Sequence, residues 1–308
     1  MKLAANLFAD PDEQEAFADS VLKTHPYRPA LVWMRARPAA DPFKLDEAQS
    51  WQPDFVDRLR RDQRPGQDER HEAGDYYLMN LASVFEAAVF TEIPERPELV
   101  VDLCAAPGGK SILAWRMLGP GRLVSNEVIG KRTAPLIANF KRCQIDPAIV
   151  TSLDSAALAA TCSDAADLVI VDAPCSGQSL IGKGKQVSAC FHSHVINHNR
   201  NRQRRILSNA AAIVRPGGHV AYMTCTYAEK ENEGNVNWFL KNFADFEAVP
   251  VGRLKGNESH LTHLPCYRLW PHRGLGPGGF TVLLRRQGDG VANVESIDGL
   301  PTRWSSCH

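Results

Sequence analysis

Short apolar runs alternate with longer amphipathic segments from about Asn80 onward. The runs Leu99–Cys104, Asp167–Asp172 and His219–Cys225 are rich in Val, Ile, Leu and Ala, which is typical of strands that a sheet buries on both faces. The segments between the runs carry apolar residues at helical spacing. Strands that alternate with helices predict an α/β fold with a doubly wound, mainly parallel sheet.

The same pattern places the individual elements. The predicted strands are Leu31–Met34, Leu99–Cys104, Arg122–Glu127, Ala148–Ser152, Asp167–Asp172, His219–Cys225, Phe246–Val251 and Phe280–Arg285. The predicted helices are Asp10–Lys23, Pro53–Arg61, Asn80–Phe90, Gly109–Leu118, Gly130–Cys143, Asn199–Val214 and Glu229–Phe243. The first helix has the clearest start, because Asp10, Pro11 and Glu13 occupy positions that favour an N-cap, a proline and an acidic residue.

A change in pattern near Gly74 predicts a division of the chain. Residues 35–72 are charged, contain proline and are weakly patterned, whereas regular alternation follows Tyr76 and Tyr77. We therefore expect a short N-terminal extension at residues 1–73, an α/β domain at residues 74–286, and a polar, loosely structured tail at residues 287–308.

Composition restricts the class of protein. Hydrophobic residues make up 44% and charged residues 23% of the 308 positions, as in ordinary globular proteins, and no apolar stretch approaches the roughly 18 residues of a membrane span. The acidic N-terminus lacks the pattern of a signal peptide. The eight cysteines include no Cys-x-x-Cys pair, so neither a zinc site nor a disulfide framework is expected. These features predict a cytoplasmic protein with no metal and no membrane association.

Reactive side chains follow three of the predicted strands. Cys175 lies after one strand in the segment Asp172–Gly177, Cys225 closes another strand, and Asp102–Lys110 leads from a third strand into a glycine turn. Because ligands bind beyond the carboxyl ends of the strands in open α/β sheets, two thiols, a carboxylate and an ammonium group should meet in one crevice. This combination favours covalent catalysis by a thiolate, whereas the remaining cysteines are expected to be buried packing residues.

The loop Ala105–Lys110 is predicted to hold a cofactor. Glycines at a strand-to-helix turn let backbone N–H groups approach a ligand closely, although the Gly-x-Gly-x-x-Gly fingerprint of dinucleotide folds is absent. Glu127, at the end of the next strand, is suited to bind ribose hydroxyls, and Asp154, after the strand that follows, is suited to accept from an adenine amino group. Because no P-loop signature occurs, the pattern favours S-adenosylmethionine over a nucleotide.

Charge is unevenly distributed along a chain whose net charge is zero. Residues 1–98 carry 19 acidic and 12 basic residues, a net charge of −7, so the remainder carries +7. Residues 173–228 contain seven basic residues and no acidic one, and such a basic face is typical of phosphate contacts. A solvated helix face is the alternative, but the neighbouring cysteines favour RNA or DNA. The candidate RNA-binding residues are Lys183, Lys185, Arg200, Arg202 and Arg204.

Four stretches in order resemble the RsmB/Sun family of S-adenosylmethionine-dependent RNA (cytosine-5) methyltransferases. They are Asp102–Lys110, Asp172–Gly177, Pro216–Gly218 leading to Thr224-Cys225, and Glu229–Glu233, and the segment Gly74–Tyr77 is also similar. The resemblance covers residues 74–286 and implies a seven-stranded class I methyltransferase sheet. The chain departs from the family at Leu78–Asn80, where a Gln and an acidic residue usually stand. It is also shorter at the N-terminus than the many members that carry an RNA-binding module there.

The resemblance implies roles for individual residues. Cys225 is the expected nucleophile toward carbon 6 of a cytosine in rRNA or tRNA, Cys175 assists product release, Asp172 contacts the pyrimidine edge, and Lys110 orients the base. The implied cofactor-binding residues are Cys104, Ala105, Ala106, Pro107, Gly108, Gly109, Lys110, Glu127, Arg132, Asp154 and Asp172. A methylation-silent RNA-binding assembly factor with the same fold is one alternative, and methylation of another acceptor, such as a protein, is a second. The sequence leaves the oligomeric state open.

Overall fold

Five parallel strands form the centre of the main sheet. The structure is a computed structural model that describes residues 2–22, 29–40, 42–60, 63–94, 96–184 and 189–306. The central strands are β4 (Leu99–Asp102), β5 (Arg122–Asn126), β6 (Ala148–Thr151), β7 (Ala166–Asp172) and β8 (Val214–Thr224). They lie in the order β6-β5-β4-β7-β8, so the strands of the reactive segments are neighbours.

Antiparallel strands extend this centre on both sides. β11 (Gly279–Arg286) pairs with β8 and carries β9 (Phe246–Val249) and β10 (Tyr267–Leu269), while β12 (Thr302–Ser305) pairs with β6. The predicted α/β fold with a doubly wound, mainly parallel sheet is confirmed, and β10 and β12 are additions that the pattern did not predict. The prediction of a loose tail is wrong for the residues described up to Ser306, because Ile297 and Leu300 are buried and β12 covers the edge of β6.

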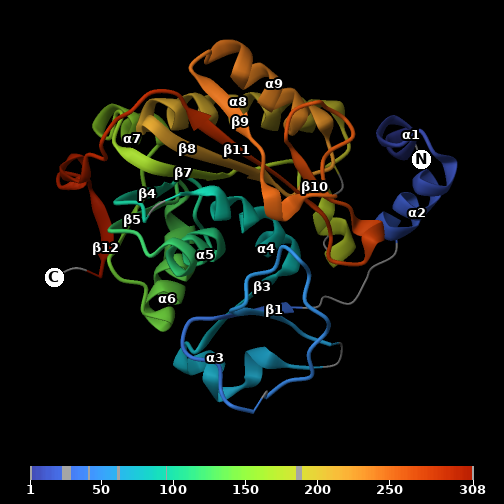
Figure 1. Cartoon of the computed structure of the whole chain (residues 1–308), viewed down its shortest axis with the longest axis horizontal. Coiled ribbons are helices and arrows are strands. Elements are labelled where there is room, and N and C mark those ends of the chain that lie inside the picture. The colour runs from blue at the N-terminus through green and yellow to red at the C-terminus, as the bar shows by residue number, and fades with distance from the viewer. Residues whose placement is uncertain are drawn as a thin grey trace.

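Helices cover both faces of the sheet, as its doubly buried strands require. One face carries α4 (Leu81–Ala87), α5 (Gly109–Leu118) and α6 (Thr133–Cys143), and the other carries α7 (Ser155–Thr161), α8 (Ser193–Ile213) and α9 (Glu233–Asn242) (Figure 1). Among the predicted boundaries that differ, α8 begins before Asn199, and β8 already includes the Pro216–Gly218 turn.

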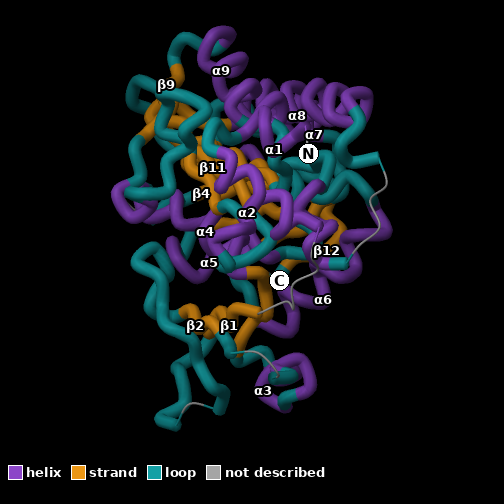
Figure 2. Tube along the Cα trace, turned by 90° about the vertical axis from the view of Figure 1, so that its right-hand side faces the viewer, coloured by secondary structure: helices purple, strands orange, loops and turns teal. Residues whose placement is uncertain are grey.

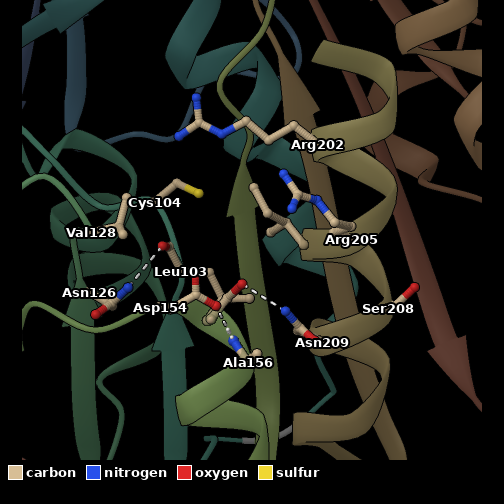
Figure 3. Close-up of a pocket in the computed structure, with 12 residues that line it drawn as sticks. Leu103, Cys104, Asn126, Val128, Asp154, Ala156, Arg202, Arg205, Ser208 and Asn209 are labelled. Carbon is tan, nitrogen blue, oxygen red and sulfur yellow. Dashed lines mark hydrogen bonds between the residues drawn. The ribbon is translucent and has the colours of Figure 1, made fainter. Parts of the chain in front are cut away.

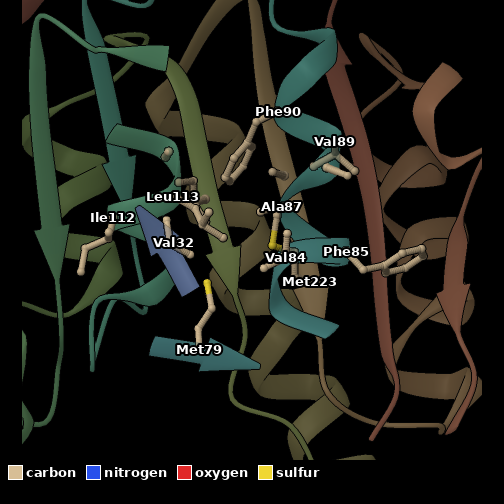
Figure 4. Packing of buried hydrophobic residues seen from close by; sticks show 14 of the residues in the cluster. Val32, Met79, Val84, Phe85, Ala87, Val89, Phe90, Ile112, Leu113 and Met223 are labelled. Carbon is tan, nitrogen blue, oxygen red and sulfur yellow. The ribbon is translucent and has the colours of Figure 1, made fainter. Parts of the chain in front are cut away.

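A continuous core joins α4 and α5 to the sheet. Val84 and Phe85 of α4, Leu113 of α5 and Met223 of β8 are packed together and almost completely buried (Figure 4). Burying each such side chain stabilises the fold by about 1.5–3 kcal/mol.

Short 3-10 helices complete the connections: η1 (Pro65–Gln67), η2 (Ala88–Glu92), η3 (Gly130–Arg132), η4 (Gln178–Lys183), η5 (Glu229–Glu231), η6 (Gly252–Leu254), η7 (Pro271–Arg273) and η8 (Val294–Ile297).

A second, three-stranded sheet lies at one end of the molecule (Figure 2). Its strands β2 (Val56–Arg58), β1 (Pro29–Trp33) and β3 (Tyr76–Asn80) are antiparallel, and α3 (Glu69–Ala73) lies beside them. The predicted helix Pro53–Arg61 is wrong in the described residues, because β2 pairs there with β1. The sheet extends past the predicted boundary at Gly74, since β3 belongs to it.

Two N-terminal helices pack against the main domain near the end of β8. α1 (Lys2–Leu7) was not predicted, whereas α2 (Pro11–Leu22) follows the predicted start, with Asp10 Oδ1 accepting the Asp12 N–H at 2.9 Å. Phe17 of α2 is buried beside Tyr227, which lies two residues after Cys225. The N-terminal residues therefore support the segment that carries a reactive thiol.

Candidate active site

A pocket of about 380 Å³ opens beyond the ends of the three consecutive strands β4, β5 and β6 (Figure 3). Its lining residues are Leu103, Cys104, Asn126, Val128, Asp154, Ser155, Ala156, Arg202, Arg205, Ile206, Ser208 and Asn209. Strand ends and the flanking helix α8 thus enclose the place where open α/β sheets bind their ligands.

The predicted cofactor loop is fixed between β4 and α5. Asp102 accepts the backbone N–H of Cys104 at 3.1 Å and the Ser111 hydroxyl at 2.6 Å, which ties the loop to the first turn of α5. Gly108 has a φ of 113°, and a Cβ there would lie 3.0 Å from Leu136 Cδ1. Glycine is therefore required for both the backbone conformation and the close packing of the turn.

The buried Glu127 and the exposed Arg132 form an ion pair beside this loop. Glu127 is 3% exposed, and its carboxylate accepts the Ile129 N–H at 2.9 Å and lies 3.0 Å from the Arg132 guanidinium. Arg132 also donates to the carbonyl of Ala106 at 2.7 Å. The two side chains therefore hold the loop Cys104–Lys110 in place while the Glu127 carboxylate stays at the end of β5.

Asp154 has two functions in the fold. Its carboxylate accepts the Ala156 N–H at 2.9 Å and caps α7, and the same residue lines the pocket (Figure 3). Asn126 extends the support by accepting from Leu153 N–H and donating to the Leu103 carbonyl. Hydrogen bonds between neighbouring strand ends thus fix the pocket floor.

The two predicted catalytic thiols lie together. Cys175 Sγ and Cys225 Sγ are 3.3 Å apart, at the ends of the neighbouring parallel strands β7 and β8. The Ser176 and Thr226 hydroxyls, one residue further along each segment, are 2.7 Å apart. The contact with Cys225, together with burial, raises the pKa of Cys175 above its ordinary value.

A cluster of polar side chains beneath the thiols fixes both segments. Glu231 accepts the Ser176 N–H at 3.0 Å and the Gln203 amide at 2.8 Å, and Gln203 also donates to the Pro174 carbonyl. Asn232 accepts the Thr224 hydroxyl at 2.6 Å and donates to the carbonyl of Thr226.

Sequence reasoning assigned no role to these supporting residues. Their only signal was that Glu231 and Asn232 fall within the family-like stretch Glu229–Glu233.

Lys110 lies between two carboxylates at the edge of a second pocket, of about 470 Å³. Its side chain is 4% exposed, and its ammonium contacts Glu86 closely and lies 3.2 Å from Asp172, whose side chain is 37% exposed. Burial would lower the pKa of Lys110, but the two carboxylates raise it. Sequence reasoning missed Glu86, because α4 follows the small sheet and gave no sign that one of its carboxylates would reach the strand ends.

The departure from the family pattern at Leu78–Asn80 has a structural explanation. Asn80 Oδ1 accepts the Ala82 N–H at 3.0 Å and caps α4, and Met79 is buried against the Gly109 turn. Asn80 also lines the second pocket, and its Nδ2 has no hydrogen-bond partner among the described residues.

The predicted basic face is only partly available to RNA. Arg204 donates to Asn235 at 3.0 Å and lies over the Trp238 ring, so it packs against α9. Arg202 reaches over the first pocket toward Cys104 (Figure 3), whereas Arg200 contacts Asn201 near the start of α8.

The structure gives no side-chain contacts for the two lysines predicted to bind RNA. Lys185 lies outside the described residues, and Lys183 ends η4 without a described side chain.

Two expected absences concern only the part of the chain that the structure describes. Searched there, His, Cys, Asp and Glu form no group of three or more that could hold a metal ion. Within the same residues, no helix is both long and apolar enough to cross a membrane.

The sheet order and the pocket beyond its strand ends are those of the class I methyltransferase fold. Residues 90–285 match the family described as 16S rRNA methyltransferase RsmB/F, and the chain belongs to this family. This confirms the predicted family and fold class, and it supports S-adenosylmethionine as the cofactor.

Curated relatives are longer than this chain. It is 31% identical over 252 residues to ribosomal RNA small subunit methyltransferase F of Klebsiella pneumoniae (strain 342), a match that covers 80% of this chain and 51% of that protein. The protein of the same name from Escherichia coli O81 (strain ED1a) is 29% identical with the same coverage. The chain thus spans about half the length of the curated relatives it matches.

Solved structures share the fold over nearly the whole chain. The crystal structure of PH0851 is 30% identical with a TM-score of 0.78, over 90% of this chain and 63% of that one. NSun6 from Pyrococcus horikoshii with SFG has a TM-score of 0.73 at 17% identity, over 94% of this chain and 97% of that one. The second similarity concerns the fold alone.

Proposed function

We propose that this protein transfers a methyl group from S-adenosylmethionine to carbon 5 of a cytosine in RNA, with small-subunit rRNA as the substrate class. The single observation that carries the proposal is the 3.3 Å contact between Cys175 and Cys225 at the strand ends, close to the Lys110–Asp172 pair. Family membership supports RNA as the acceptor.

The first pocket is suited to the adenine side of S-adenosylmethionine, because Asp154 lines it and can accept from the adenine amino group. Glu127, at the end of β5, presents a buried carboxylate suited to ribose hydroxyls. The loop before α5 lines the second pocket with Ala105, Ala106, Pro107, Gly109 and Lys110, at the start of a helix. The cofactor supplies an electrophilic methyl group when it is bound. The predicted residues Cys104–Lys110, Arg132 and Asp172 complete the proposed cofactor-binding side.

The second half of the site is suited to activate a pyrimidine. Carbon 5 of cytosine is a weak nucleophile, and addition of the Cys225 thiolate to carbon 6 makes carbon 5 enamine-like. Carbon 5 then takes the methyl group, a base removes its proton, and the bond between sulfur and carbon 6 breaks to return the thiolate. Asp172 hydrogen-bonds the pyrimidine edge and Lys110 orients the ring, where charge develops.

The contact between the two thiols is suited to a division of roles. Either sulfur can donate a hydrogen bond across their 3.3 Å separation, so an S–H group at Cys175 can stabilise a thiolate at Cys225. The same proton-carrying group is suited to assist product release.

Labelled S-adenosylmethionine with small-subunit rRNA, followed by nucleoside analysis, tests the proposal. We expect label in 5-methylcytosine, none with Cys225→Ala, and a covalent protein–RNA adduct with Cys175→Ala that survives denaturing electrophoresis. RNA binding without any methylation would favour the assembly-factor alternative. An adduct in Cys225→Ala instead of Cys175→Ala would reverse the roles of the thiols.

A further inference from the structure

Glu86 is a buried carboxylate that the proposed reaction does not use. It lies on the inner face of α4, its side chain is 4% exposed, and its contact with Lys110 is closer than that between Lys110 and Asp172. A charged carboxylate is costly to bury unless it is paired. Its position at the strand ends therefore calls for a functional explanation.

The neighbouring strand β11 makes room for this carboxylate. A Cβ at Gly279 would overlap Glu86 Oε1, and the Thr281 hydroxyl donates to the Glu86 carbonyl at 2.9 Å. Gly279 leaves space for the Glu86 side chain, and the hydrogen bond from Thr281 holds this turn of α4 against the sheet. The Glu86 side chain is consequently aimed at Lys110 rather than at solvent.

The ammonium of Lys110 has three N–H donors. One is directed to Glu86 and one to Asp172 Oδ2, which leaves a third for an acceptor on the base. If Glu86 were absent, the flexible Lys110 side chain could turn fully onto Asp172 and occupy the oxygen that the pyrimidine edge requires.

The titratable and charged groups facing Glu86 come from three elements: Lys110 from α5, Asp172 from the end of β7, and Cys225 from the end of β8. On β11 the facing groups are Gly279 and Thr281, which do not titrate. Burial raises the pKa of Glu86 to about 8, the charges of Asp172 and Cys225 add to this shift, and Lys110 opposes it. Coupling is reciprocal, so an ionised Glu86 also disfavours the Cys225 thiolate.

We propose that Glu86 is a positioning residue for methyl transfer, which holds the Lys110 ammonium between its own carboxylate and that of Asp172. This inference rests on the proposed function, since it gives Glu86 a part in the same reaction. Glu86 touches neither the base nor the cofactor in this account. Its effect passes through Lys110.

Two variants separate the hydrogen bond from the charge. Glu86→Gln keeps an acceptor for Lys110 but removes the ionisable group, whereas Glu86→Ala removes both. Glu92→Gln, on the adjacent η2, is the matched control, because Glu92 contacts the Gly252 N–H away from the thiols. Each protein is assayed for kcat and KM on RNA, for S-adenosylmethionine affinity by calorimetry, and for the pH dependence of Cys225 alkylation by iodoacetamide, read by peptide mass spectrometry.

We expect Glu86→Ala to lower kcat by about tenfold or more, as loss of orientation does, with cofactor affinity within about twofold of the parent. Glu86→Gln should recover most of that loss and should shift Cys225 alkylation to lower pH. The Glu92 control should match the parent in both.

Parental kcat in Glu86→Ala would overturn the positioning role, and an unshifted alkylation midpoint in Glu86→Gln would overturn the coupling. The alkylation experiment needs no RNA and no folded Ala variant. A parent protein that fails to methylate RNA would therefore refute the proposed function separately.

Discussion

Replacement of Glu127 by Gln is expected to weaken S-adenosylmethionine binding without unfolding the protein. Within the described part of the chain, Glu127 Oε1 accepts one backbone N–H and Oε2 meets one arm of Arg132, so lone pairs remain on both oxygens for the two ribose hydroxyls. Each hydrogen bond to a charged group contributes about 1.5–3 kcal/mol. Gln keeps the size of the side chain but loses the charge and one acceptor.

The net loss should be about 2–3 kcal/mol, because the hydroxyl that loses its acceptor can still bind water. At 1.4 kcal/mol for each factor of ten, this corresponds to roughly 30- to 150-fold weaker binding. The melting temperature should change little, since Arg132 is 48% exposed and its charge remains solvated after the substitution.

Isothermal titration with S-adenosylmethionine measures this effect, and a thermal melt serves as the folding check. Glu98→Gln is the matched control, because Glu98 precedes β4 at the opposite end of the same sheet. Cofactor affinity equal to that of the parent in Glu127→Gln would refute the ribose assignment. A large fall in melting temperature with unchanged affinity would mean that the Glu127–Arg132 pair only supports the loop.

Two further predictions concern the basic helix and the response to acid. Arg200→Ala should weaken RNA binding, reduce the slope of log affinity against log salt concentration by about 0.7–0.9, and leave cofactor affinity unchanged. Arg204→Ala should instead lower the melting temperature, because it loses the contacts with Trp238 and Asn235. Filter binding across salt concentrations and thermal melts separate the two effects, and an unchanged slope for Arg200→Ala would make that residue part of a solvated face. Burial, with the charges of Arg285 and Arg215, lowers the pKa of His219 to about 4. Its contribution to the free energy of unfolding is therefore fully present above the unfolded pKa of about 6.5 and is lost as the pH falls toward 4. The total loss is about 3 kcal/mol. Urea unfolding of His219→Gln between pH 7 and pH 4 should show a flatter dependence than the parent, and parallel curves would contradict this account.

Much of the fold could be predicted because buried parallel strands leave a strong signal. Leu99–Cys104 and Asp167–Asp172 are nearly continuous apolar runs, and β4 and β7 occupy them as neighbours. Short edge elements gave no such signal. β12 has exposed and half-exposed positions and depends on pairing with β6, and β2 is three residues long and follows proline-containing sequence.

The candidate site likewise contains residues that the sequence predicts and residues that it does not. Cys175, Cys225 and Asp172 could be predicted, because each follows a recognisable strand and parallel strands end at one edge. Glu86 and Gln203 could not, since each lies on a helix whose register against the sheet is decided by packing. Arg204 shows the opposite error. Its place in a basic run predicted an RNA contact, but its side chain packs against α9, where it contacts the Trp238 ring and the Asn235 amide.

The residues that hold the reactive groups are more deeply buried than the reactive groups themselves. Glu231, Asn232 and Gln203 are all fully buried, while Cys175 and Cys225 are partly exposed. Donors and acceptors fixed in this way need no rearrangement when charge develops on the substrate, which is the condition under which they stabilise a transition state most effectively. Under the proposed function, such a site accepts only a base that has already left its stack. The cost of extruding that base is then met by RNA contacts outside the two pockets or by a naturally unpaired target.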